Sequence, residues 1–248
     1  MRPTTRTAAT CLVLLALATP TSTPARADDA PGGDWIDLNR PDAWKNRAKG
    51  WATAAAARLD AQDPKRLATE PGSALLCNGP AGKVPNISTV EEFGDVEVRF
   101  DFLLPRGSNS GIKFQEVYEV QLFDSHGVME PKGTDSGGVY PRSELKPKYH
   151  HIDEGHPPLV NAALPAGEWQ TLEATFIAPR FDRDGKKVAD ARISATLNGR
   201  KVQDDLKVDT PTGNNHRNKE KATGPLLLQG DHGPVAIRNM RARRLDAR

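Results

Sequence analysis

The sequence predicts an all-β protein, a sandwich of two antiparallel sheets. Many short segments alternate apolar and polar residues, turn signals separate them, and hardly any stretch has the period of a helix. The clearest predicted strand is 95–104, where Val96, Val98, Phe100 and Phe102 point to one side and charged residues point to the other. One face of this strand is therefore expected to lie in the core.

Further strands with the same pattern are predicted toward the C-terminus. Residues 168–177 and 191–197 alternate in the same way, and Asn198-Gly199 after them is among the strongest hairpin signals. Residues 224–229 and 235–243 are the last two predicted strands, joined by a Gly-Asp-His-Gly turn. Because no internal repeat is visible, we expect a single domain.

The N-terminal third contains three tryptophans, Trp35, Trp44 and Trp51, in a polar setting where we expect short strands and loops. We expect them to pack in the core or at a sheet edge, because aromatic side chains chiefly bury area, although one of them could stack on a sugar. The alanine-rich run 51–59 could be taken for a helix, but it lacks an apolar stripe of helical period. Residues 73–77 have the pattern of a strand.

The first 27 residues have the pattern of a secretory signal peptide. Arg2 and Arg6 form a positively charged start, residues 11–18 an apolar core, and Ala25-Arg26-Ala27 a cleavage site. The apolar run is too short to span a membrane, and no later stretch approaches the roughly 20 residues that a membrane helix needs. We therefore expect an exported protein, periplasmic or extracellular, with one mature domain over 28–248.

The charge balance of the mature chain is close to neutral. Removing the signal peptide takes away three of the 34 basic residues and none of the 32 acidic ones. Such a balance gives no electrostatic case for nucleic acid or an anionic membrane as a partner. Cys77 is then the one remaining cysteine, which we expect to be a small buried apolar residue. The core must hold the fold without an internal disulfide, as a monomer or a small homo-oligomer.

Common catalytic signatures are absent: the sequence contains no P-loop, no G-x-S-x-G elbow and no H-E-x-x-H motif. The stretch 107–125 stands out instead, because a turn of small polar residues directly precedes a strand that carries an acid and an amide. Alternation from Val117 places Glu119 and Gln121 on one face, about 6.5 Å apart. Both side chains could therefore reach one ligand.

Nine polar residues at strand ends and in mid-strand positions are candidates for a site. Amides, carboxylates and a histidine can each make two hydrogen bonds to neighbouring hydroxyls, which suits a sugar ligand. The candidates are Asn109, Lys113, Glu119, Gln121, Asp124, Tyr140, Gln229, His232 and Arg238.

Several candidates have a purely structural alternative, which the sequence leaves open. Glu119 could be a solvated residue paired across strands with Lys113 or Arg99. Asp124 could close a turn, and His232 could be an ordinary turn residue.

The segment 126–165 is too long for a simple connection in a compact domain, so we expect a functional loop. It contains a cluster of metal-binding residue types: His150, His151, Asp153, Glu154 and His156. Loops of this composition are more often solvated than metal-bound, and nothing in the sequence requires a metal.

Six short motifs occur along the chain in an order that resembles one known family. They are Gly107-Ser108-Asn109-Ser110-Gly111, the run from Tyr118 to Ser125, Gly137-Gly138-Val139-Tyr140, the run from Pro165 to Trp169, Leu197-Asn198-Gly199, and the run from Gly224 to Gly233 followed by Arg238-Asn239. Together they resemble the 3-keto-disaccharide hydrolases, over nearly the whole mature chain from about residue 35 to 243.

The resemblance implies a concanavalin-like jelly-roll sandwich that acts on oligosaccharides or glycosides oxidised at C3 of a glucose unit. A ketone at C3 acidifies the proton on C2, so a base can remove it and the C1 substituent can leave by elimination. Adding water back gives net hydrolysis. This route explains a carbohydrate enzyme without the usual pair of glycosidase carboxylates.

On this resemblance, Glu119 or His232 is the expected base, and Asp124 is an acid or orients a neighbour. Hydroxyls or the enediolate are expected to bind to the polar side chains of Asn109, Lys113, Gln121 and Gln229, with Tyr140 and Arg238 as further substrate contacts. A bound divalent ion could stabilise the enediolate, although no ligand set demands one.

Two departures from the family pattern and two other functions remain. Trp169-Gln170 replaces the usual Trp-Asn, and the segment 142–158 does not match the family pattern. A sandwich of this kind could also be a lectin-like module that binds sugars unchanged, or a structural domain. Glu119 converging with His232 or Asp124 in one cavity would favour the enzyme. An open groove lined by Trp or Tyr without such a pair would favour the lectin.

Overall fold

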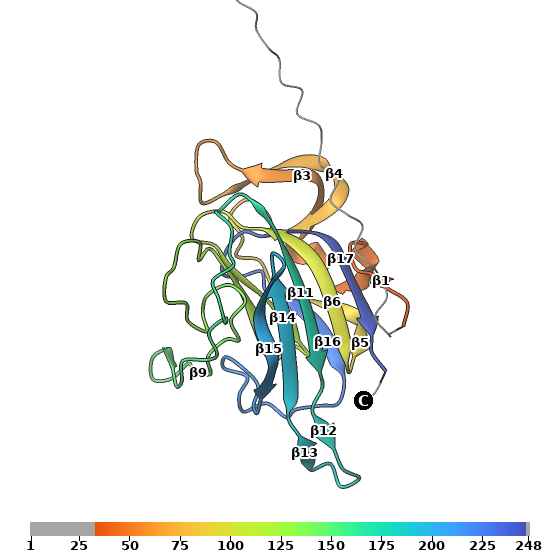
Figure 1. Cartoon of the computed structure of the whole chain (residues 1–248). Coiled ribbons are helices and arrows are strands. Elements are labelled where there is room, and N and C mark those ends of the chain that lie inside the picture. Colours follow the sequence, from red (N-terminus) through yellow and green to blue (C-terminus); the bar gives the residue numbers. More distant parts are fainter. Residues whose placement is uncertain (1–32, 247–248) are drawn as a thin grey trace, which may run out of the picture. The chain divides into compact units, whose positions relative to one another are not determined.

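The computed structural model describes residues 33–246 (Figure 1). The predicted signal peptide lies outside the described residues. Nearly all regular structure is β, arranged in two main antiparallel sheets that pack face to face. This confirms the predicted all-β sandwich.

The larger sheet contains the strong C-terminal strands predicted from alternation. Its strands are β1 (Ile36–Asp37), β3 (Ala52–Leu59), β4 (Leu67–Cys77), β6 (Val96–Leu103), β11 (Trp169–Ile177), β14 (Ala191–Leu197), β15 (Arg200–Val208) and β17 (Ala236–Arg244). They run in the order β15-β14-β11-β6-β17-β4-β3, with β1 also paired to β17. The alanine-rich run is a strand rather than a helix, because β3 pairs with β4 along its length.

The smaller sheet carries the stretch that the sequence singled out. Its strands are β2 (Trp44–Lys45), β5 (Ile87–Phe93), β7 (Asn109–Phe114), β8 (Tyr118–Phe123) and β16 (Gly224–Leu228), in the order β2-β5-β16-β7-β8. β7 and β8 form a hairpin at the end of this order. The polar residues of this hairpin point away from the larger sheet, because their neighbours Ile112, Val120 and Leu122 lie in the core.

Short elements complete the described part of the chain. They are the 3-10 turns η1 (Pro41–Ala43) and η2 (Arg47–Lys49) and the strand pairs β9 (Ser143–Glu144) with β10 (His150–His151) and β12 (Arg180–Phe181) with β13 (Lys187–Ala189). A turn at residues 182–185 joins β12 to β13, with Gly185 N–H donating to the carbonyl of Asp182. Within residues 33–246, no helix has the length and apolar character that crossing a membrane requires.

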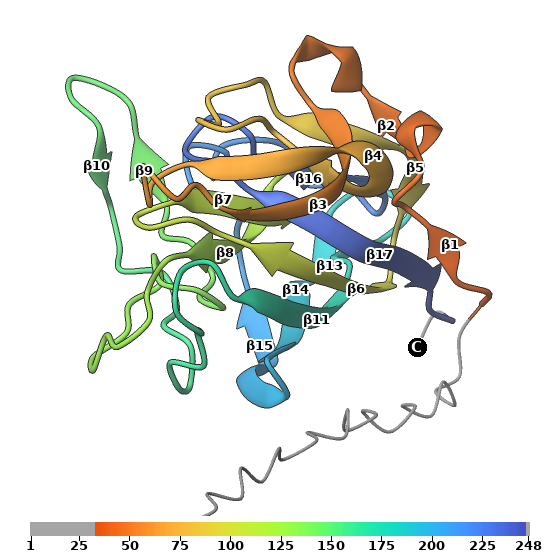
Figure 2. The ribbon, with the colours of Figure 1, turned by 90° about the horizontal axis from the view of Figure 1, so that it is seen from above.

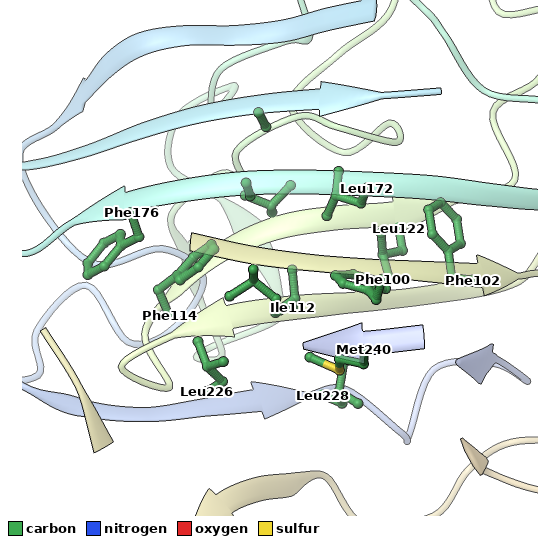
Figure 3. Packing of buried hydrophobic residues seen from close by; sticks show 14 of the residues in the cluster. Phe100, Phe102, Ile112, Phe114, Leu122, Leu172, Phe176, Leu226, Leu228 and Met240 are labelled. Carbon is green, nitrogen blue, oxygen red and sulfur yellow. The ribbon is translucent and has the colours of Figure 1, made fainter. Parts of the chain in front are cut away.

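The core lies between the two sheets and is built from aromatic and aliphatic side chains (Figure 3). Phe100 and Phe102 of β6 and Phe176 of β11 come from the larger sheet, and Ile112 and Phe114 of β7 come from the smaller one. The rings of Phe114 and Phe176 stack across the sandwich at 4.9 Å with an interplanar angle of 8°. Trp44, Trp51 and Cys77 are also buried, as the sequence predicts.

The long segment 126–165 extends the smaller sheet instead of lying free. Val139 bridges Val120 of β8, and the backbones of Gly138 and Tyr140 hydrogen-bond to Gln121 and Glu119. β9 and β10 then project at one side of the sandwich (Figure 2). The edge of β8 is therefore paired, and Glu119 and Gln121 are buried although they point away from the core.

Phe176→Ala is expected to lower the free energy of unfolding by about 3–5 kcal/mol, because it leaves a cavity beside Phe114 in the closed core. Urea unfolding followed by circular dichroism measures the change. Val188→Ala, at a side chain that is 63% exposed, is the control and should change stability by less than about 0.5 kcal/mol. Equal stability of the two variants would contradict this account of the core.

Candidate active site

The floor of the candidate site is an ion pair on the β7–β8 hairpin. The strand register places Lys113 of β7 directly opposite Glu119 of β8. Lys113 Nζ lies 3.0 Å from Glu119 Oε2, and the Glu119 residue is only 2% exposed. A carboxylate buried this deeply needs a charged or hydrogen-bonding partner to remain ionised, and Lys113 supplies one. The cross-strand pair considered from sequence exists, but it is buried and not solvated.

Gly111 makes room for this carboxylate. It faces Gln121 in the register, two positions from Lys113, so a Cβ here would point to the same side as Glu119. That Cβ would lie 2.4 Å from Glu119 Oε1, closer than real contacts allow. A glycine is therefore needed for Glu119 to lie flat across the hairpin.

Three amide side chains continue the polar surface beside the ion pair. Gln121 Nε2 donates to Asn109 Oδ1 at 3.3 Å. Gln229, which follows β16, is anchored because its backbone N–H donates to the carbonyl of Gly111. In the described residues, the buried Oε1 atoms of Gln121 and Gln229 have no hydrogen-bond partner, so they are available to a donor.

The walls come from two loops that backbone hydrogen bonds join together. Ser143 N–H donates to the carbonyl of Gly213, and Gly213 N–H donates to the carbonyl of Pro141. Thr212 holds the second loop against β8, since its hydroxyl accepts from the N–H of Glu119. Loops some 70 residues apart in sequence thus stand beside the same strand.

Together the floor and walls enclose a polar cavity of about 410 Å³, within the usual range for a small-molecule site. Six of the nine sequence candidates line it. They are Asn109, Lys113, Glu119, Tyr140, Gln229 and His232. The other lining residues are Asn86, Ser143, Leu145, Tyr149, Gly213, Asn214 and Asp231. Gln121 lies behind Asn109 and supports it.

Tyr140 stands at the rim with two partners that the sequence did not indicate. Its hydroxyl lies 2.9 Å from that of Tyr149 and 3.2 Å from His151 Nε2. Burial raises the pKa of Tyr140 well above its ordinary value, and the hydrogen bond to Tyr149 and the negative charge of Glu119 act in the same direction. The phenol is therefore protonated at neutral pH and can donate a hydrogen bond into the cavity.

His232 also lines the cavity. It lies in the Gly-Asp-His-Gly turn that follows β16. Its Nδ1 is 2.5 Å from Asp231 Oδ1, which orients the ring and favours a proton on that nitrogen. The ring is exposed to solvent, so His232 can exchange protons with water. The two sequence candidates for the base, Glu119 and His232, therefore line one cavity.

Besides Gln121, two predicted site residues do not line the cavity. Asp124 Oδ2 accepts the N–H of Gly107 at 2.8 Å, so this carboxylate closes the turn that precedes β7. Arg238 belongs to β17 of the larger sheet, where it stacks 4.0 Å over the ring of Trp169 and pairs with Asp101. Local alternation could not show that Arg238 is on the other sheet.

The histidine-rich segment has separate local roles. His151 contacts the two tyrosines, Asp153 pairs with Arg142 at 2.5 Å, and His156 pairs with Val139 through its backbone. Among residues 33–246, no three His, Cys, Asp or Glu side chains gather in a way that could hold a metal ion.

Sequence reasoning missed the residues that reach the cavity from connecting loops. Tyr149 and Leu145 belong to the long segment already expected to be functional, but no periodic pattern distinguishes them. Asn86 is held by its side-chain oxygen, which accepts the N–H of Gly230. Asn214 lies in a polar loop, where an asparagine carries no signal of its own.

The geometry defines a polar, sugar-sized cavity with an ionisable pair, carried on one sheet of a sandwich. A family model described as the 3-keto-alpha-glucoside-1,2-lyase-like domain matches residues 34–243. The chain belongs to this family, which confirms the resemblance found in the sequence and makes it a carbohydrate-active protein.

Solved structures share the fold. A candidate glycosyl hydrolase from Parabacteroides distasonis ATCC 8503 is 22% identical with a TM-score of 0.57, and the match covers 79% of each chain. A second one from the same organism is 18% identical with a TM-score of 0.54, covering 86% of this chain and 100% of that one. No curated protein matches the sequence.

Gly111→Ala is expected to lower the free energy of unfolding by about 1–3 kcal/mol, because the new Cβ would displace the Glu119 carboxylate from its place beside Lys113. Urea unfolding followed by circular dichroism measures the change. Gly33→Ala is the matched control, since its Cβ would meet a single atom at 3.6 Å. Unchanged stability of Gly111→Ala would contradict the role given to this glycine.

Proposed function

We propose that the protein cleaves glycosides oxidised at C3 of a glucose unit, with Glu119 as the base that removes the C2 proton. The observation that carries this proposal is the buried Lys113–Glu119 pair at the floor of an open polar cavity. A carboxylate held there faces the ligand and is largely shielded from water, which suits a base.

The first step moves one proton and one negative charge. Glu119 takes the proton from C2, and the electron pair of the C–H bond forms the C2–C3 double bond of an enediolate whose negative charge lies on the C3 oxygen. Lys113 loses its anionic partner when Glu119 is protonated, and its ammonium group can then pair with this oxygen. Stabilising a charge where it develops is a large contribution to catalysis.

The second step breaks the bond between C1 and its substituent. The C3 oxygen reforms a ketone, the C2–C3 electrons form a C1–C2 double bond, and the substituent leaves with the bonding pair. In this proposal His232, whose ring Asp231 orients, gives the leaving oxygen a proton. Water added across the new double bond gives 3-ketoglucose, so the balance is hydrolysis, whereas release before hydration is a lyase reaction.

Amide groups would hold the sugar during both steps. Asn109, Gln229 and Asn86 offer donors and acceptors along one side of the cavity, and the protonated Tyr140 offers a donor from the other. Such paired groups suit adjacent hydroxyls. Export to the periplasm or the medium, which rests on the N-terminal pattern, would bring the protein to oxidised sugars outside the cytoplasm.

A lectin-like module would need no ionisable pair buried beneath its ligand. Burying Lys113 and Glu119 costs desolvation energy that binding of a neutral sugar does not repay. The pair therefore supports the enzyme over the module that binds sugars unchanged.

Glu119→Gln is expected to lower kcat on 3-keto-trehalose by about 10²–10⁴-fold, because the amide cannot accept the C2 proton. Release of 3-ketoglucose or its enol from the purified protein is the measurement. Glu116→Gln, on the same hairpin but exposed and hydrogen-bonded to Ser88, is the matched control and should retain full activity.

Failure of the parent protein to act on any 3-keto-glucoside would overturn the proposed function. Activity of Glu119→Gln equal to that of Glu116→Gln would leave the reaction standing but remove Glu119 as its base, and His232 would then be tested in the same way.

Prolonged treatment with EDTA is expected to leave kcat on 3-keto-trehalose unchanged, because Lys113 can supply the positive charge that the enediolate needs. Activity is compared before and after chelator and dialysis. A loss that Mg²⁺ or Mn²⁺ restores would show that a metal ion stabilises the enediolate and that Lys113 has a different role.

A further inference from the structure

The outer end of the cavity differs in character from its floor. Leu145 and Tyr149 line this outer end, and the two residues are 59% and 49% exposed, respectively. Both belong to the long segment 126–165, which the sequence predicts to be a functional loop. Large apolar side chains exposed at the mouth of a ligand cavity are typical of a surface that a ligand covers.

A second hollow, of about 290 Å³, continues from this end of the cavity. The two spaces share Ser143, Leu145 and Asn214, so Leu145 lies between them and is in contact with both. The second hollow is therefore the neighbouring space that a ligand bound over Glu119 would meet beyond Leu145.

Glu144, His216 and Arg217 at the second hollow are engaged with one another, and Lys146 also lines it. Glu144 forms an ion pair with Arg217, and His216 Nε2 lies 4.0 Å from the same carboxylate. This carboxylate is consequently committed to protein partners. The Arg217 guanidinium, exposed on one side, can stack against a flat ring, as arginine does on aromatic groups.

We propose that the second hollow is the subsite for the leaving group and that it selects a flat, apolar aglycone such as a phenol. The inference rests on the proposed function and adds the class of substrate. The ring would lie over Leu145, with Tyr149 on the cavity side and Arg217 on the far side.

An aromatic aglycone fits this surface better than a second sugar does. A second sugar would expose several hydroxyls to Leu145, and each hydroxyl left without a partner costs free energy. An aromatic ring covers Leu145 and needs at most one hydrogen bond, which the shared Asn214 or Ser143 can provide.

The test compares two substrates and two variants. Leu145→Asn is expected to lower kcat/KM for 4-nitrophenyl 3-keto-glucoside about tenfold or more, and to change that for methyl 3-keto-glucoside by less than about twofold. Each variant is compared with the parent on the same substrate, so the different reactivity of the two leaving groups cancels.

Leu159→Ala is the matched control, because Leu159 lies in the same long segment, is 66% exposed and lines neither space. It should leave both substrates unaffected. A thermal melt of Leu145→Asn, expected within about 2 °C of the parent, separates a change in the subsite from a change in fold.

The outcomes distinguish the two proposals. If the parent cleaves neither substrate, the proposed function fails and the subsite fails with it. If the parent cleaves both and Leu145→Asn affects them equally or not at all, the 3-keto-glucoside activity stands and the aromatic subsite is wrong.

Discussion

The buried ion pair between Lys113 and Glu119 is the constraint on which the rest of the site depends. Two charges beneath a protein surface are stable only when they are held together, so the register of the β7–β8 hairpin must bring them face to face. Gly111 must lack a side chain for the carboxylate to fit. The size of the side chains in this hairpin is therefore limited on both faces. The core limits it on one face, and the Glu119 carboxylate limits it on the other.

The site consists of a floor built from sheet strands and walls built from loops. The two parts differ in how tightly the rest of the fold holds their residues. The floor residues are fixed by ladder hydrogen bonds and by the core packing beneath them, which keeps a reacting group in place. The walls are loops, but the bridge between Arg142 and Gly213 and the contacts to β8 hold them against the sheet. The floor and the walls can thus change independently, which would separate the proposed chemistry from the proposed selection of the aglycone.

Prediction from sequence succeeded for properties that depend only on a residue's position within its own strand, such as the face on which its side chain lies. Alternation placed Glu119 and Gln121 on one face. The small polar stretch before them was predicted as a turn, but Asn109, Ser110 and Gly111 belong to strand β7. Prediction failed for Arg238, whose strand belongs to the other sheet, and for Asp124, whose carboxylate closes the turn at Gly107. Both have the residue type that a site needs, and only the position of their strand or turn excludes them from the cavity.

The sequence by itself determined the sandwich, the order of its strands along the chain and the polar character of one hairpin face, because side-chain alternation has a period of two and is read locally. Only the tertiary structure decided that this face is buried, that Tyr149, Leu145 and Asn214 reach it, and that His232 stands over it. These residues come together through backbone bonds between loops, such as Ser143 to Gly213. Such contacts join distant parts of the chain and leave no periodic trace in either one.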